Sequence, residues 1–143
     1  MSSIDTDKAF AKVLQLLSLT HAQTYQAGDL IFSEGDIGDK IYFVSSGRLN
    51  IFIQQNKEKR SLCSLAAGEV FGEMAILNNL PRTASVEAEI DSKLVVLERD
   101  VFFSLMEKYP VLSLKMVRLM AERMQIMDEQ FKQELGYHQN RSI

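Results

Sequence analysis

The sequence contains one cysteine and two histidines among 143 residues. Because Cys63 stands alone, the chain cannot build an internal disulfide framework, a Cys-only zinc site or an iron–sulfur cluster. His21 and His138 are isolated and too few for a multi-histidine metal enzyme, so we expect no metal site. No run approaches about 18 apolar residues, and no apolar stretch follows the polar N-terminus. We therefore expect no membrane span, no signal peptide and a cytoplasmic location.

The charge balance is slightly acidic, with 16 Lys and Arg against 19 Asp and Glu and a net charge of −3. A dedicated nucleic-acid-binding protein usually presents a basic face, so we expect no nucleic-acid partner. Hydrophobic residues make up 46% of the chain and charged residues 24%, which predicts a packed core. The length favours a single domain over residues 1–143.

The first segment, residues 5–18, has the pattern of an amphipathic helix. Phe10, Val13, Leu14 and Leu17 follow the spacing i, i+3, i+4, i+7 and form one apolar stripe. Asp5 is the residue that we expect to cap its start.

Residues 21–98 change to short β-rich stretches separated by glycines, which predicts an α+β chain with an antiparallel β-roll. Within Leu49–Gln54, alternation places Leu49, Ile51 and Ile53 on one half-buried face. The predicted strands are Leu30–Ser33, Ile41–Val44, Leu49–Gln54, Ser61–Leu65, Thr83–Glu87 and Lys93–Leu97.

Helical periodicity returns over residues 99–136. We expect Asp100 to cap a short helix that ends at Tyr109, because proline disfavours helix in the residue before it. Pro110 then suits the start of a longer helix, and Gly136 suits its end. Residues 137–143 are expected to be a frayed tail.

The long helix carries an apolar seam over about two heptads. Two interpretations stay open: the seam packs on the chain's own β-roll, or part of it pairs with the same helix of a second copy. The seam residues are Val117, Met120, Met124, Met127 and Phe131, and a second apolar row contains Leu112, Met116, Leu119 and Ile126.

Residues 71–86 contain the residue types of a phosphate and sugar site. Gly72 permits a sharp turn or a close approach to a ligand, and residues 73–77 are long enough for a short helix. The planar guanidinium of Arg82 can hold phosphate oxygens, and the carboxylate of Glu73 can accept from sugar hydroxyls. The alternative is that Arg82 and Glu73 simply pair across a surface turn.

This segment resembles the phosphate-binding cassette of the cyclic-nucleotide-binding domain family, which includes catabolite activator proteins, kinase regulatory subunits and cyclic-nucleotide-regulated channels. The match runs through Phe71, Gly72, Glu73, Met74, Ala75 and Ile76, a five-residue spacer, and then Arg82, Thr83 and Ala84. The resemblance implies a jelly-roll-like β-roll of about eight strands, with one helix before it, a short helix in the cassette at 71–84 and two helices after it.

The resemblance also implies a role for individual cassette residues. Arg82 binds the cyclic phosphate, together with backbone N–H groups around Gly72, Met74 and Ala75. Glu73 accepts from the ribose 2′-hydroxyl. Thr83 contacts phosphate and is compatible with either cAMP or cGMP, so the choice stays open with cAMP favoured.

Three further residues are expected around the sugar and base. Cys63 and Leu65 alternate onto one strand face and form an apolar wall, and Phe71 adjoins the cassette. Arg123 lies where channel-type relatives place an arginine over the purine. Its alternative is an ordinary exposed ion pair with a neighbour.

We therefore expect a cyclic-nucleotide-binding regulatory module with no catalytic residue and no cofactor, whose C-terminal helices reposition when cAMP or cGMP binds. No helix-turn-helix follows the long helix, so the expected downstream partner is another protein, and a homodimer through the long helix is an additional expectation. The alternative function is a structural dimerisation module with a pocket that binds nothing. The sequence is compatible with a free-standing receptor and with a domain of a larger protein.

Overall fold

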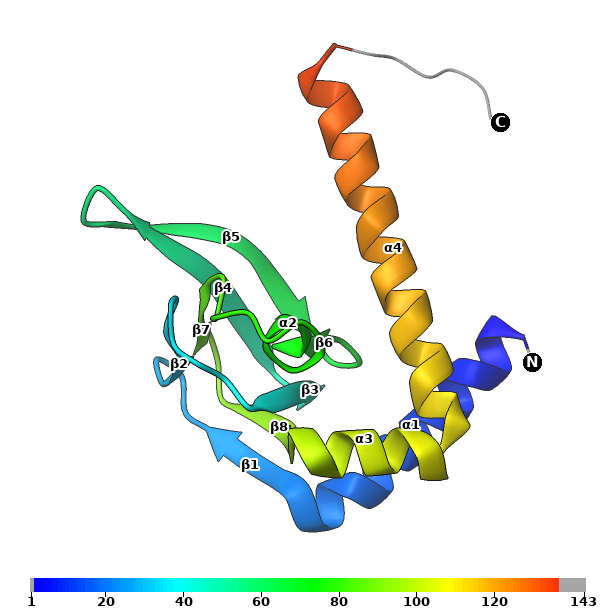
Figure 1. Ribbon diagram of the computed structural model, residues 1–143. Helices are drawn as coiled ribbons and strands as arrows, with labels where there is room; N and C mark the ends of the chain where they lie inside the picture. The colour runs from blue at the N-terminus through cyan, green and yellow to red at the C-terminus, as the bar shows by residue number, and fades with distance from the viewer. Residues whose placement is uncertain (1, 137–143) are drawn as a thin grey trace.

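The computed structural model describes residues 2–136, which form a β-roll flanked by helices (Figure 1). Within this range, eight strands make two four-stranded sheets of order β1-β8-β3-β6 and β2-β7-β4-β5, with antiparallel pairing throughout. The predicted α+β fold with an antiparallel roll is confirmed. The strands are β1 Ala22–Tyr25, β2 Leu30–Phe32, β3 Lys40–Ser46, β4 Arg48–Gln55, β5 Glu58–Ala66, β6 Val70–Phe71, β7 Ser85–Ala88 and β8 Ser92–Glu98.

Four helices complete this part of the chain: α1 Ser3–His21, α2 Glu73–Leu77, α3 Arg99–Lys108 and α4 Pro110–Glu134. The prediction that Asp5 caps α1 is wrong. Ser2 occupies the cap, and its Oγ accepts a 3.1 Å hydrogen bond from the backbone N of Asp5. The earlier start is possible because a serine oxygen satisfies an N–H group of the first turn, which places Asp5 inside the helix.

Asp100 is also not a cap. Strand β8 runs to Glu98, which occupies the cap position of α3 without a side-chain hydrogen bond, and Asp100 lies in the first helical turn. A carboxylate in that turn still favours the helix through the helix dipole. Asp100 therefore correctly indicates where the helix starts, but the residue at the cap position is Glu98, two positions earlier.

Strands β3 and β8 are buried on both faces, which explains why their sequences are nearly continuous runs of apolar residues. Ile41, Phe43, Val95 and Leu97 pack toward the helices with Phe10, Phe102 and Leu112, whereas Tyr42, Val44, Leu94 and Val96 face the second sheet. Two apolar clusters thus lie on either side of one sheet, and α1, α3 and the first half of α4 cover its outer face. This arrangement holds the ends of β6 and α2 in fixed positions next to α4.

A β-bulge interrupts the pairing of β4 with β5. Ile51 pairs with Cys63 while the next residue, Phe52, pairs with Ser61, so Leu62 is an extra residue on β5. Leu49 is buried and Ile51 and Ile53 are half-buried, which agrees with the predicted half-buried face, and Phe52 is buried as well. Consecutive residues of β5 around the bulge, Leu62 to Leu65, all line one pocket.

Helix α4 begins at Pro110 as expected, and Gly136, with φ of 70°, follows its end. Leu112 and Met116 are buried, but Val117, Met124, Met127 and Phe131 are 64%, 70%, 67% and 59% exposed. The first half of α4 packs against α1 and α3, and the second half projects beyond them (Figure 1). In residues 2–136, most of the heptad seam therefore lies uncovered.

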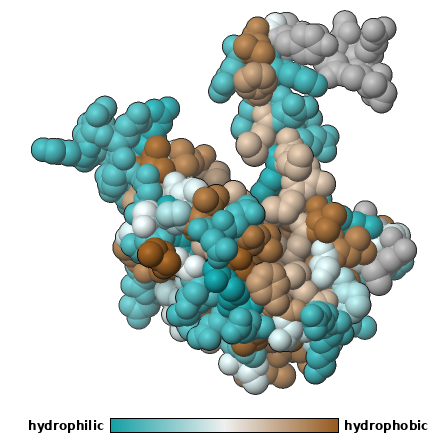
Figure 2. Space-filling model, viewed as in Figure 1, coloured by the Kyte–Doolittle hydropathy of each residue, from teal (hydrophilic) through white to brown (hydrophobic). Residues whose placement is uncertain are grey.

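Hydrophobic side chains are visible along α4 and on the neighbouring side of the roll, whereas polar residues cover the β4–β5 hairpin (Figure 2). Of the helices that the structure describes, none combines the length and apolar character that crossing a membrane would need. The predicted tail at 137–143, with His138, lies outside the described residues.

Candidate functional site

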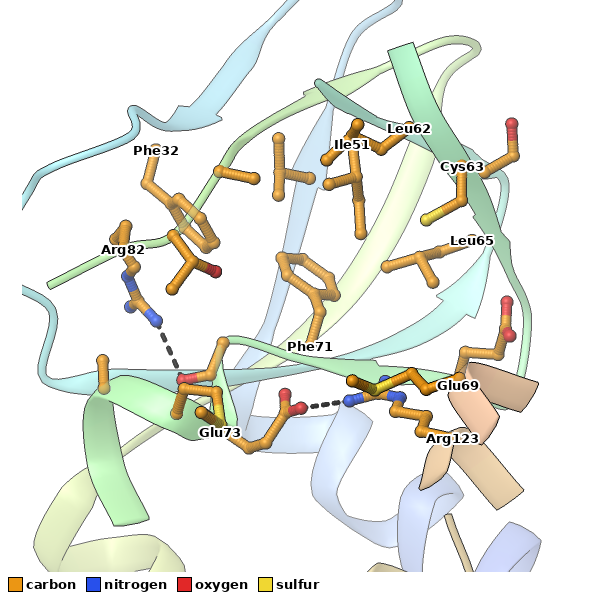
Figure 3. Close-up of a pocket in the computed structure, with 18 of the residues that line it drawn as sticks. Phe32, Ile51, Leu62, Cys63, Leu65, Glu69, Phe71, Glu73, Arg82 and Arg123 are labelled. Carbon is orange, nitrogen blue, oxygen red and sulfur yellow. Dashed lines mark hydrogen bonds and ion pairs between the residues drawn. The ribbon is translucent and has the colours of Figure 1, made fainter. Parts of the chain in front are cut away.

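A pocket of about 520 Å³ lies between the sheet that contains β4 and β5, the segment that contains α2, and helix α4. It brings together residues from β2, β4 and β5, from the segment that runs from Glu69 through α2 to β7, and from α4 (Figure 3). All ten residues predicted for the site line it: Cys63, Leu65, Phe71, Gly72, Glu73, Met74, Ala75, Arg82, Thr83 and Arg123.

The backbone of the cassette turns sharply at Gly72, which has φ of 81° and precedes the first residue of α2. A side chain is disfavoured there because of the left-handed conformation. In addition, a Cβ on Gly72 would lie 2.7 Å from Arg82 Nη1. Two independent features therefore favour glycine at position 72: the left-handed backbone turn and the close approach of the Arg82 guanidinium.

Arg82 is 6% exposed, and its guanidinium donates to two main-chain carbonyls. Nη1 donates to the Gly72 carbonyl at 2.8 Å, and Nη2 donates to the Lys40 carbonyl at 2.9 Å. Nε is buried and has no hydrogen-bond partner. Burial lowers the pKa of Arg82 from its ordinary value, an effect opposed by the nearby Tyr42 hydroxyl and by the carboxylates of Asp39, Asp36 and Glu73. A fixed, desolvated cation of this kind suits an anionic ligand.

Glu73 and Arg123 bind each other across the pocket. The Glu73 side chain is 8% exposed and accepts from Arg123 Nη1, while Arg123 Nη2 donates to the Val70 carbonyl. Arg123 therefore links α4 to β6 and α2 by two hydrogen bonds, of which Figure 3 shows the one to Glu73. The expected positions of both residues beside the ligand are consistent with this contact, and the purine-covering role of Arg123 stays a prediction.

The opposite wall of the pocket is apolar and belongs to β4 and β5. Leu65 is 6% exposed, and Ile51, Leu62 and Cys63 line the hollow beside it. Burial raises the pKa of the Cys63 thiol, the Glu69 carboxylate adds to the rise, and Arg123 opposes it. The thiol is therefore neutral near pH 7 and acts here as a small apolar group.

The sequence interpretation missed eleven residues of the pocket lining. Ile126, Met127 and Gln130 lie three, four and seven positions after Arg123, so helical spacing could have identified them. Phe32 had no comparable signal because it reaches the site through the pairing of β2 with β7, opposite Val86. The other missed residues are Ile51, Leu62, Ser64, Glu69, Pro81, Ala84 and Val86. In the part of the chain that the structure describes, no group of three or more His, Cys, Asp or Glu side chains could hold a metal ion.

Comparison with known proteins agrees with this geometry. The family model described as cyclic nucleotide-binding domain matches residues 22–109. The cyclic AMP receptor protein of Thermus thermophilus is 34% identical over 113 residues, which cover 78% of this chain and 52% of the relative. The human potassium/sodium hyperpolarization-activated cyclic nucleotide-gated channel 4 is 37% identical over 100 residues, covering 70% of this chain and 8% of the channel.

The structural comparison extends beyond the β-roll. The crystal structure of Thermus thermophilus catabolite activator protein superposes with a TM-score of 0.73 at 30% identity, covering 92% of this chain and 59% of that chain. The chain thus spans about half the length of its bacterial relative and a small fraction of the channel. Both the matched family model and the roll with its flanking helices lead to one conclusion: the chain belongs to the cyclic nucleotide-binding domain family.

Proposed function

We propose that this chain is a regulatory module that binds a cyclic nucleotide, cAMP in preference to cGMP, and signals through the position of its C-terminal helices. The observation that carries the proposal is that the buried Arg82 and Glu73 share one pocket with an apolar wall that includes Cys63 and Leu65. Arg82 supplies a cation for the phosphate, Glu73 an acceptor for a ribose hydroxyl, and the wall a surface for the sugar and base.

The backbone N–H groups around Gly72, Met74 and Ala75 are proposed to add to phosphate binding. Thr83 is exposed at the pocket, where its hydroxyl can reach the phosphate or a guanine amino group. Arg123 is proposed to exchange its contact with Glu73 for one with the ligand, which couples occupancy of the pocket to α4. We propose no cofactor and no catalytic residue; the nucleotide is a ligand. A cytoplasmic location and a downstream protein partner stay predictions.

The test is thermal unfolding with saturating cAMP or cGMP, with Arg82→Ala as the control. A ligand at about 100 times its Kd adds about 2.7 kcal/mol to the free energy of unfolding. For a domain of this size, that corresponds to a rise in Tm on the order of 10 °C. We expect a rise in the wild type, larger with cAMP, and none in the variant. A folded wild type whose Tm neither nucleotide changes would contradict the proposal.

A second candidate function is supported by the uncovered seam on α4. Val117, Met124, Met127 and Phe131 are all more than half exposed, which suits contact between two copies of the helix. Sedimentation equilibrium across a concentration series tests for a homodimer. A dimer without any effect of nucleotide on Tm would favour the structural module with a non-binding pocket.

A further inference from the structure

We propose that Phe32 is a positioning residue for Arg82, holding the guanidinium where it meets an anionic ligand. The guanidinium carbon of Arg82 lies 4.1 Å from the centroid of the Phe32 ring. Attraction between a cation and an aromatic face is strongest where water is excluded, and Arg82 is 6% exposed. The consequence for ligand affinity rests on the proposed function, whereas the positioning itself does not.

The need for a positioning residue follows from the place of Arg82 in the chain. Arg82 lies between α2 and β7 in neither helix nor strand, so no ladder of regular hydrogen bonds fixes it. Its main chain is held by the loop after β2: the Arg82 N–H donates to the Asp36 carbonyl at 2.8 Å, and the Gly35 N–H donates to the Arg82 carbonyl at 2.8 Å. The segment that begins with Phe32 therefore holds both the backbone and the side chain of Arg82.

The guanidinium is enclosed by more than the ring. A Cβ on Gly38 would lie 2.3 Å from Arg82 Cζ, so the loop backbone approaches the cation closely. The carbonyls of Gly72 and Lys40 accept from its two terminal nitrogens. Together with the Phe32 ring, these contacts fix the orientation of the guanidinium. The buried Nε–H group of Arg82 has no hydrogen-bond acceptor.

The ring itself is held by two aromatic neighbours from the other sheet. Its centroid lies 5.6 Å from that of Tyr42 and 5.9 Å from that of Phe71, and these two rings stack at 4.8 Å. Tyr42 belongs to β3 and Phe71 to β6, whereas Phe32 belongs to β2. Phe32 thus connects the two sheets at the point where Arg82 packs, so its orientation is set by the core rather than by the ligand.

The first experiment measures nucleotide affinity by calorimetry. Phe32→Leu is expected to raise the Kd for cAMP by about 3- to 30-fold, and Phe32→Tyr, which keeps the ring, to change it by less than about 3-fold. Phe52→Leu is the matched control, because Phe52 is 5% exposed, has a cation over its ring, Lys59 at 4.5 Å, and lies outside the pocket lining. It is expected to leave the Kd unchanged.

Phe32 also lines the pocket, so a double-mutant cycle separates positioning from direct contact with the ligand. In an Arg82→Ala background, Phe32→Leu is expected to have no further effect on the Kd for cAMP. If it raises the Kd equally in both backgrounds, Phe32 acts through its own contact with the nucleotide and the proposal is overturned.

The second experiment needs no nucleotide. In an NMR spectrum of the arginine Nε–H groups, a ring 4.1 Å away shifts the Arg82 signal, which Arg82→Lys identifies by its disappearance. Phe32→Leu is expected to move this signal, and Phe52→Leu to leave it in place. An unmoved signal in Phe32→Leu overturns the positioning role even if cAMP binds. A moved signal in a wild type that binds no cyclic nucleotide supports the positioning role and overturns the proposed function.

Discussion

The two arginines of the pocket are held in different ways. Arg82 is 6% exposed and donates to the carbonyls of Gly72 and Lys40, both within the roll. The side chain of Arg123 is 35% exposed and reaches from α4 to Glu73 and Val70. One cation therefore belongs to the body of the roll, while the other belongs to α4, whose far half exposes Met124, Met127 and Phe131.

This difference separates two tasks that a signalling domain must perform. A site that recognises a ligand gains affinity from groups that are already in place, because little freedom is lost on binding. A switch needs a contact that exists in one arrangement and is exchanged in another. The burial of Arg82 suits recognition, and the contact between Arg123 and Glu73 suits exchange.

The largest expected effect tests this division directly. Arg82→Ala is expected to raise the Kd for cAMP by about 100-fold or more, since charge-assisted hydrogen bonds in a desolvated site are the strong ones. Arg123→Ala is expected to raise it by less than about 10-fold, because that side chain is partly solvated. Calorimetric titration gives both values. Equal losses in the two variants would mean that the helix, like the roll, is part of the recognition surface.

The next prediction locates the point at which α4 leaves the body of the protein. Met116 is 5% exposed and Met124 is 70% exposed on the same helix. Met116→Ala is expected to lower the free energy of unfolding by about 2–4 kcal/mol, and Met124→Ala to change it by less than about 0.5 kcal/mol. Urea unfolding measures both. A large loss in Met124→Ala that depends on protein concentration would show that a second copy covers the outer half of α4.

A smaller effect is expected from the ion pair that joins α4 to the cassette. Glu73→Gln and Arg123→Met, measured singly and together by urea unfolding, should show a coupling energy of about 1 kcal/mol. The partial exposure of Arg123 limits the value. Saturating cAMP is expected to remove the coupling, since the nucleotide takes over the carboxylate of Glu73. A coupling that persists with ligand bound would contradict the proposed exchange.

The smallest effect concerns the chemistry of Cys63. Because burial and Glu69 raise the thiol pKa, less thiolate is present at any given pH, and alkylation by iodoacetamide should become fast only at more alkaline pH than for a free cysteine. Arg123 opposes the rise in pKa, so Arg123→Met should slow alkylation further at pH 8. Arg82→Lys is the control and should leave the rate unchanged. Equal rates in all three proteins would place Arg123 too far from β5 to affect the thiol.

Much of the candidate site could be predicted because its signals are local. Gly72, Glu73 and Arg82 lie within eleven positions of one another, and their spacing is set by one short helix and one turn. The long helix could be bounded in the same way, since Pro110 and Gly136 act on the backbone of their own segment. For such features, neighbouring residues contain the necessary information.

Other features depend on contacts between distant segments. The bulge at Leu62 arises from the register of β4 against β5, and no alternation within a single strand reveals it. Phe32 reaches Arg82, which lies fifty positions later in the sequence, because β2 pairs with β7. The wrong caps have a different origin: Ser2 and Asp5 both carry suitable oxygens, and propensity alone does not distinguish the position from which a helix starts.

The dimensions of α4 have a mechanical consequence. At a rise of about 1.5 Å per residue, Arg123 lies about 20 Å from Pro110 along the axis, and Glu134 lies about 36 Å from it. If the helix pivots about its first turn, the far end travels nearly twice as far as the residue that touches the cassette. In the proposed function, α4 therefore acts as a lever, with Arg123 on the short arm at the pocket and Glu134 at the end of the long arm.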